Sequence, residues 1–237
     1  MASVSKAILM NELLARVQEN IESEKLFAVA TVVSENGASQ AVGAKMIVYP
    51  DGKTEGTLGA GPVTGEIVRE AQRLLTLETS ETREFGERQV FIEVFEPPPM
   101  LIIVGGVHTA IPLSRLAKLL GMRVIVVDGR GRFATRERFP DADQIIVEWP
   151  DDALPKLPIN SSTYVVVLTH DPKFDIPTLV ALSKMRPRYV GAMGSRETRK
   201  QHFAELRAQG VPDEFLQTVY GPIGLDLGAR SPEEMAV

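Results

Sequence analysis

The amino-acid sequence predicts an α/β protein in which a small α+β N-terminal domain precedes a Rossmann-like, doubly wound parallel sheet domain. From residue 101 onward, short continuous apolar runs alternate with helical patterns, which is typical of buried parallel strands that helices cover on both faces. Before residue 97 the pattern differs. Two strand-like runs flank a Pro-Asp-Gly turn at 50–52 and indicate an antiparallel hairpin.

The boundary between the two domains is predicted at residues 96 and 97. Three successive prolines at 97–99 stop regular structure and form a stiff connector. The sequence therefore predicts an N-terminal domain over 1–96 and a C-terminal domain over 97–237.

The N-terminal domain is expected to begin with an amphipathic helix, because apolar residues recur at helical spacing between Lys6 and Ser23. A strand over 26–33 is expected to end at a Ser-Glu-Asn-Gly turn signal at 34–37. The remaining elements are predicted in the same way: strands over 44–49, 54–58 and 89–95, and a helix over 66–77.

A glycine-rich loop over 59–65 joins the hairpin to that helix. Its N–H groups, including those of Gly59 and Gly61, are suited to hold a phosphate or another anion. An ordinary loop without a ligand is the alternative, and the pattern alone leaves both open.

The C-terminal domain is expected to contain five strands, mostly separated by helices. Helices are predicted over 111–120 and from Ser195 to about Gln209. The strands are expected over 101–104, 124–127, 144–147, 164–168 and 189–191.

Ligands of doubly wound sheets bind beyond the carboxyl ends of the strands, so the segments that follow the strands form the predicted site. We expect four of them to converge on one crevice: Gly105 to His108, Asp128 to Arg130, Thr169 to Asp171, and Gly194 to Arg196.

Individual residues of these segments suggest roles in binding. The backbone at Gly105 and Gly106 faces the pyrophosphate in dinucleotide-binding βαβ units, and an acid at the position of Asp128 accepts hydrogen bonds from ribose hydroxyls. Arg196 is expected to clamp an anionic ligand. Ser195 either assists it or only caps the helix.

The dinucleotide fingerprint G-x-G-x-x-G/A is incomplete in this chain. Gly105 and Ala110 fill its first and last positions, but Val107 stands where the middle glycine belongs. A side chain there would push a pyrophosphate away from the backbone, so NAD(P) binding and NAD(P)-dependent oxidoreductase activity remain an alternative. A further alternative is that the glycines serve only packing.

Two of the three histidines, His108 and His170, follow predicted strands. Together with Asp128 or Asp171 they could hold a divalent metal, although their spacing matches no known ligand set. The neighbours His170 and Asp171 could instead transfer protons. His202 lies inside the last long helix and is predicted to be a surface residue. No catalytic triad is evident.

Composition excludes several classes of protein. The chain has no cysteine, which rules out disulfides and thiolate chemistry and fits a cytoplasmic protein. Its net charge of −5 comes without a basic cluster, so nucleic acid is not an expected partner. No apolar run has the length that a membrane span needs.

With these residues in view, the chain resembles the XdhC/CoxI family of accessory proteins for xanthine dehydrogenase and related molybdenum hydroxylases. The resemblance covers most of the chain, and its most specific parts are 189–196 and the tail. The segments that carry it are 41–46, 51–52, 59–65, 105–110, 126–128, 169–171, 189–191, 194–196 and 221–228.

The resemblance implies a cytoplasmic, homodimeric and non-catalytic chaperone that binds molybdenum cofactor. It would hold the cofactor while a cysteine desulfurase-type sulfurase acts on it, and then help to insert it into the apoenzyme of a xanthine dehydrogenase or CO dehydrogenase-type molybdenum hydroxylase. Glycine-rich N–H groups, Arg196 and Lys45 suit the phosphate and the oxyanion-like metal head of that cofactor.

The chain departs from the family pattern at several positions. The family usually has cysteines where this chain has Pro62 and around Gly86, so thiol contact with molybdenum is unsupported. It usually has glycine at the position of Val107. These losses leave a degenerate scaffold protein as a third hypothesis. Family members also continue beyond Val237, so a truncated product is one expectation.

Overall fold

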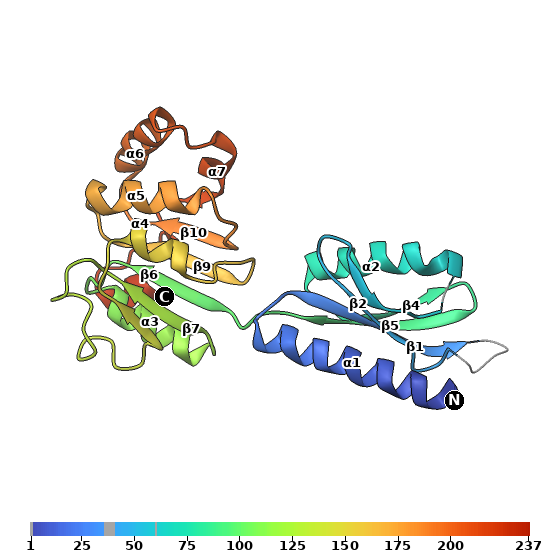
Figure 1. The fold of residues 1–237 in the computed structure, drawn as a ribbon. Coiled ribbons are helices and arrows are strands. Elements are labelled where there is room, and N and C mark those ends of the chain that lie inside the picture. Colours follow the sequence, from blue (N-terminus) through green and yellow to red (C-terminus); the bar gives the residue numbers. More distant parts are fainter. Residues whose placement is uncertain (1, 36–40, 60) are drawn as a thin grey trace. The chain divides into compact units, whose positions relative to one another are not determined.

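The computed structural model describes residues 2–35, 41–59 and 61–237, and these form two compact units over 1–97 and 98–237. Figure 1 shows the elements of each unit. Within the described residues, no helix is both long enough and apolar enough to cross a membrane.

The first unit is an antiparallel sheet with one helix on each face (Figure 1). Its strand order is β3-β2-β1-β5-β4, and its helices are α1 (Ala2–Glu22) and α2 (Thr64–Leu77), the latter preceded by a short 3-10 turn, η1 (Gly61–Val63). The strands are β1 (Phe27–Glu35), β2 (Lys45–Val48), β3 (Thr54–Gly56), β4 (Glu81–Phe85) and β5 (Arg88–Phe95).

Alternation along the strands of this unit divides its core into two layers. In one layer, Ile67 and Leu74 of α2 pack against one face of the sheet. In the opposite layer, Leu13 of α1 packs against Phe27 and Ile47. The predicted hairpin is confirmed by the antiparallel pairing of β2 with β3.

Two details of the first unit differ from the sequence prediction. The strand predicted to end at Val33 continues to Glu35, because Ser34 and Glu35 pair with β5 after an irregularity in register. The rest of that predicted turn, 36–37, lies outside the described residues. Strand β4 was not predicted, because its polar sequence Glu-Thr-Arg-Glu-Phe carries no apolar alternation at this edge of the sheet.

The second unit is a parallel six-stranded sheet with the order β11-β10-β9-β6-β7-β8. All of its pairs are parallel. The strands are β6 (Met100–Val104), β7 (Arg123–Val127), β8 (Gln144–Ile146), β9 (Thr163–Val167), β10 (Tyr189–Ala192) and β11 (Val219–Tyr220). The Rossmann-like parallel sheet expected from the sequence is therefore confirmed.

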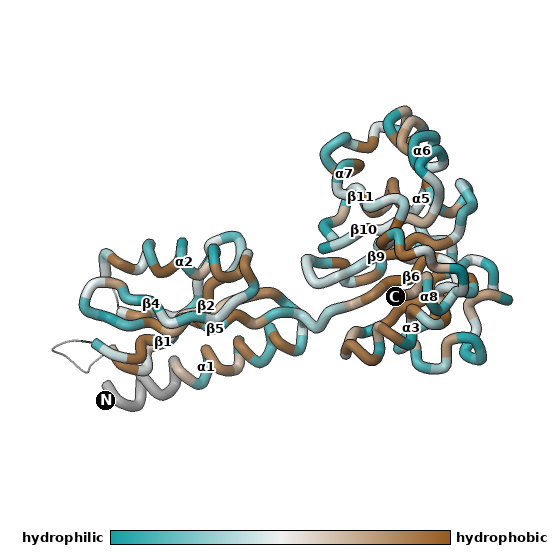
Figure 2. The backbone as a smooth tube through the Cα atoms, turned by 180° about the vertical axis from the view of Figure 1, so that it is seen from behind, coloured by the Kyte–Doolittle hydropathy of each residue, from teal (hydrophilic) through white to brown (hydrophobic). Residues whose placement is uncertain are grey.

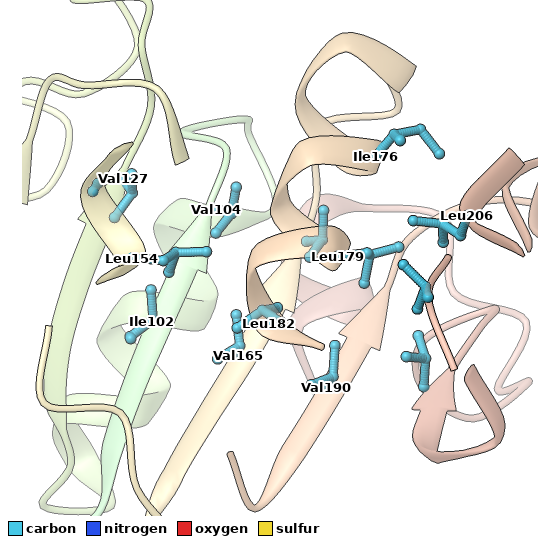
Figure 3. Close-up of a cluster of buried hydrophobic side chains, with 14 of the residues drawn as sticks. Ile102, Val104, Val127, Leu154, Val165, Ile176, Leu179, Leu182, Val190 and Leu206 are labelled. Atoms are coloured by element: carbon cyan, nitrogen blue, oxygen red, sulfur yellow. The ribbon is translucent and has the colours of Figure 1, made fainter. Parts of the chain in front are cut away.

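Helices cover both faces of this sheet. They are α3 (Ala110–Leu119), α4 (Pro150–Ala153) with the 3-10 turn η2 (Leu154–Lys156), α5 (Pro172–Leu182), α6 (Arg196–Ala208), α7 (Asp213–Thr218) and α8 (Pro232–Ala236). Figure 3 shows how Ile102, Val104 and Val165 meet Leu179 and Leu182 of α5 on one face.

The opposite face of the sheet packs against α3. Residues Leu101, Ile103 and Val126 alternate with those of the first face and contact Ala110 and Ala117. Figure 2 shows the resulting hydrophobic band along β6 and β9. Because both faces are buried, the strands read in sequence as continuous apolar runs.

Candidate functional site

The sheet of the second unit reverses its strand order between β6 and β9. From β6 the chain proceeds outward through β7 to β8, then returns to β9 on the other side of β6 and continues to β10 and β11. In doubly wound sheets such a reversal separates the loops that follow the two central strands and forms the usual ligand crevice. The segments after β6 and β9 are therefore the centre of the candidate site.

The glycine turn after β6 packs closely against its neighbours. Gly105 has a φ of +104°, and a Cβ there would lie 2.6 Å from the Thr169 side chain. A Cβ on Gly106 would lie 2.4 Å from the carbonyl oxygen of Phe133. Both glycines are thus required by contacts within the protein, which supports the packing alternative.

Val107 does not point into a ligand path as its place in the fingerprint suggested. Its side chain packs against the core cluster on the α3 face of the sheet. The neighbouring His108 is exposed. The segment before α3 therefore offers an external ligand one exposed histidine and no glycine cradle.

Asp128 follows β7 and is buried, with 1% of its surface exposed. Its carboxylate accepts four hydrogen bonds, from the Gly106 N–H, the Arg130 N–H, and the Nε and Nη2 of Arg130. Burial acts to raise the pKa of Asp128, but these hydrogen bonds outweigh it and the pKa is lowered. The sequence prediction that Asp128 binds a ribose does not fit, because its acceptor sites are occupied.

The guanidinium of Arg130 lies over two aromatic rings. Its Cζ is 4.3 Å from the ring centroid of Phe133 and 5.0 Å from that of Phe174. The Trp149 ring in turn stacks on Phe174, with the two ring centroids 4.5 Å apart. The ion pair, supported by cation–π contacts, therefore clamps the segments after β7 and β8 onto α5.

A hollow of about 440 Å³ opens beside the ends of β9 and β10, and we call it the tail hollow. The tail of the chain, residues 222–237, forms much of its wall. The other lining residues come from the predicted site segments and α6: His170, Met193, Gly194, Ser195 and Thr198.

His170, which lines this hollow, has an unusual backbone conformation. Its φ is +59°, in a region that residues other than glycine rarely adopt, and its side chain is exposed. Such strain is common at functional sites. The next residue, Asp171, caps α5 by accepting a hydrogen bond from the Lys173 N–H at 3.0 Å.

Ser195 is the N-cap of α6. Its hydroxyl accepts a hydrogen bond from the Thr198 N–H at 3.0 Å and lies 2.9 Å from the Thr198 hydroxyl. The capping role expected of this residue is therefore present. The other N–H groups of the first helical turn have no intrahelical partner, and the positive end of the helix dipole adds to their attraction for anions.

A buried polar cluster lies behind the hollow. The Thr169 hydroxyl donates to Asp175, whose side chain lies 4.0 Å from the Nδ1 of His202. Burial raises the pKa of Asp175, although the Thr169 hydrogen bond and the two histidines His170 and His202 act against this rise. The prediction of a surface position for His202 was wrong, because only 11% of its side chain is exposed.

The prediction for Arg196 also requires correction. Its side chain does not line the tail hollow. It lines a second hollow of about 380 Å³ between α6 and α7, together with Arg199, Lys200, Phe203, Arg207, Leu216 and Gln217. Because the side chains of a helix project in different directions, neighbours such as Ser195 and Arg196 face different surroundings.

Three other predicted residues belong to the first unit. Lys45 donates to the Thr31 hydroxyl at 2.8 Å, which ties β2 to β1. Gly59 and Gly61 have positive φ angles and open space where a Cβ would stand. Their contact with a ligand stays a prediction.

The described residues contain no group of three or more His, Cys, Asp or Glu side chains arranged to hold a metal ion. A metal site formed by Asp128 with His108 or His170 is further disfavoured, because the carboxylate of Asp128 already accepts hydrogen bonds from Arg130 and Gly106.

The residues predicted from sequence did not include the apolar part of the tail hollow. Met193, Ile223, Leu225 and Leu227 line it, and the tail turns at a cis Gly221–Pro222 peptide bond. The signal was present as the glycine-spaced run at 221–228, which attracted notice for its family likeness and not for binding.

Comparison with known proteins identifies the two units. The family described as the XdhC Rossmann domain matches residues 101–237, and the XdhC and CoxI family matches residues 21–86. A solved structure of a xanthine dehydrogenase from Bacillus halodurans, 21% identical, superposes with a TM-score of 0.53 over 93% of this chain and 91% of that one. At that identity it supports the fold alone.

Three curated relatives are similar in sequence. The uncharacterized protein YqeB of Escherichia coli is 27% identical over 89% of this chain and 42% of its own length. A probable subunit of xanthine dehydrogenase from Bacillus subtilis is 35% identical over 62% of this chain and 43% of its own. The molybdenum cofactor insertion chaperone PaoD of Escherichia coli is 30% identical over 33% and 25%. The chain thus spans less than half the length of these relatives.

Proposed function

The chain belongs to the XdhC and CoxI family, and from this premise we propose that it binds molybdenum cofactor in the tail hollow and serves the maturation of a molybdenum hydroxylase. The observation that carries the proposal is the meeting of His170, Gly194 and Ser195 with the tail around one hollow beyond the strand ends. The relative named as a molybdenum cofactor insertion chaperone supports the same role.

The residues of the tail hollow fit the chemistry of this cofactor. Its volume of about 440 Å³ is in the usual range for small-molecule sites. Apolar side chains such as Ile223 and Leu225 suit a flat ring system, while the Ser195 hydroxyl and the free N–H groups of α6 suit a phosphate. His170 would then donate or accept a hydrogen bond at the polar edge of the ligand.

The charge of the wall restricts where a phosphate can be held. Glu234 lines the hollow, and hydrogen bonds from the Arg230 and Ser231 N–H groups lower its pKa, so it is ionised at neutral pH. A phosphate beside this carboxylate is repelled. The N-terminus of α6 is therefore the proposed phosphate position.

In this proposal the chain holds and protects the cofactor and carries out no reaction itself. The cofactor supplies redox chemistry only in the enzyme that finally receives it. The sulfurase, the hydroxylase apoenzyme and a second copy of this chain are the proposed partners, as the family membership suggests, and the cytoplasm is the proposed location.

The test is an anaerobic titration of the whole chain with molybdenum cofactor released from a molybdoenzyme, followed by the fluorescence of the single tryptophan, Trp149. We expect saturable binding that His170→Asn weakens about 10-fold, the loss of one or two polar contacts. Asparagine tolerates the positive φ at this position, so the fold is kept.

His108→Asn is the matched control, because His108 is also an exposed histidine after a central strand but does not line the hollow. It is expected to bind like the wild type. No saturable binding to the wild type would exclude the proposed function, and equal losses in both variants would exclude the tail hollow as the site.

A further inference from the structure

The hollow between α6 and α7, which we call the basic hollow, concentrates positive charge on a chain of net charge −5. Its lining includes four cations, Arg196, Arg199, Lys200 and Arg207. Of these, Arg207 is paired with Asp213 at 2.6 Å. For the other three, the described part of the chain offers no carboxylate within ion-pair distance.

Arg199 is held by more contacts than the other two unpaired cations. Its guanidinium lies 4.7 Å from the centroid of Phe203, and its Nη2 donates to the Val219 carbonyl at 3.3 Å. Its Nε is buried, and within the described residues it has no hydrogen-bond partner. A half-buried guanidinium held without a carboxylate is an unbalanced charge that a partner can neutralise.

The floor of the basic hollow is apolar. Leu216 is buried and Phe203 half-buried, while Arg196 and Lys200 stand exposed at the rim. Protein interfaces commonly combine an apolar centre, arginine and an outer charged rim. The apolar floor would add nothing to the binding of a small inorganic anion.

We propose that the basic hollow is a docking site for an acidic segment of a partner protein, with carboxylates at Arg196, Arg199 and Lys200 and an apolar side chain on Phe203 and Leu216. The site is independent of the proposed cofactor. Its lining shares no residue with the tail hollow, which Ser195 and Thr198 of the same helical segment line. A docked partner would therefore contact the same helix that caps the proposed cofactor site.

The experiment uses the whole chain and a fluorescein-labelled peptide in which one phenylalanine is flanked by glutamates. Fluorescence anisotropy at low salt should show saturable binding. The double variant Arg196→Glu/Lys200→Glu should weaken it at least ~10-fold, because two attractive rim charges become repulsive. Both residues are exposed, and Glu at the first position of α6 favours the helix dipole, so folding is preserved.

The matched control is Lys184→Glu/Arg186→Glu, which reverses two exposed cations of the same unit outside the basic hollow. It should leave the affinity within about twofold of the wild type. Replacing the phenylalanine of the peptide by alanine should also weaken binding, because the apolar floor loses its occupant.

Three results would overturn the proposal. These are equal losses in the two double variants, no effect of the alanine peptide, and displacement of the peptide by millimolar phosphate at constant ionic strength. The last would identify a small-anion site. The peptide is titrated in the absence of molybdenum cofactor, and the cofactor is titrated into the wild type, so failure here and failure of cofactor binding are distinguishable.

Discussion

The N–H of Gly106 donates a hydrogen bond of 2.9 Å to the buried carboxylate of Asp128, across the turns that follow the neighbouring strands β6 and β7. The glycine N–H and the acid that would serve a dinucleotide in a ligand-binding βαβ unit satisfy each other here. This contact turns the first crossover into a structural clamp and leaves ligand binding to the opposite side of the strand-order reversal.

Replacing Asp128 is therefore expected to destabilise the second unit. Asp128→Asn removes charge-assisted hydrogen bonds to Arg130 and should cost ~2 kcal/mol of unfolding free energy. Urea unfolding followed by Trp149 fluorescence measures this cost. A variant as stable as the wild type would show that the clamp carries no net stability.

The pH dependence of this contribution has a defined sign. The folded pKa of Asp128 is lowered, so its contribution is complete above the unfolded value of about 3.9 and is lost as pH falls through the folded pKa. The difference in stability between wild type and Asp128→Asn should thus shrink below about pH 4. A constant difference down to about pH 2 would contradict it.

Asp175 should behave in the opposite way, because burial raises its folded pKa. A raised pKa means that the folded state binds the proton of Asp175 more tightly than the unfolded state does. The stability that this proton contributes is therefore present below about pH 3.9 and is lost as pH rises through the folded pKa. Asp175→Asn should therefore gain stability relative to the wild type on going from acidic to neutral pH. Unfolding curves across this range test the sign, and a relative loss would contradict it.

Gly106→Ala tests whether this glycine serves packing or a ligand. The added Cβ would stand 2.4 Å from the Phe133 carbonyl oxygen, and the strain should cost about 1–3 kcal/mol. Gly131→Ala is the control, because the nearest atom to its Cβ is a side-chain carbon at 3.5 Å. If both variants were equally stable, the packing role of Gly106 would be wrong.

The dinucleotide alternative can be tested by calorimetry with NAD and NADP. We expect no heat of binding to the wild type. The carboxylate of Asp128 already accepts hydrogen bonds from Arg130, and Thr169 and Phe133 pack directly against the glycine turn. Micromolar binding that Asp128→Ala abolishes would restore the dinucleotide site.

Two variants of Ser195 distinguish its role as a helix cap from a role in ligand binding. Ser195→Ala should cost ~1 kcal/mol of stability, whereas Ser195→Asp keeps an N-cap acceptor and should remain stable. The added carboxylate should repel an anionic ligand at the α6 N-terminus, so Ser195→Asp should weaken cofactor binding more than Ser195→Ala does. The same titration measures both. The reverse order of affinities would argue against a phosphate at this position.

Local pattern was enough to predict five of the six strands of the second unit, including β6 and β7, because burial on both faces leaves continuous apolar runs. It missed β11, which is only two residues long. It was also not enough for β4 of the first unit, which is polar and owes its conformation to pairing with β5. In such cases, pairing with a neighbouring strand outweighs the weak intrinsic β propensity of the segment.

The candidate site, too, was predictable only in part. The turns after the strands were predictable, since parallel strands end at one edge. The direction of each side chain was not, as Arg196 and His202 show: Arg196 lines the basic hollow, and His202 turns inward to Asp175.

The sequence by itself determined the two-part α/β organisation, the segments beyond the strand ends and the likeness to one family, because periodicity and motifs are local properties of the chain. Only the tertiary structure decided that Asp128 is occupied by Gly106 and Arg130, and that the tail walls a hollow with His170 and Ser195. Apart from the local pair of Asp128 and Arg130, these contacts join residues that are far apart in sequence. Their partners therefore depend on strand order and helix rotation, which no local pattern encodes.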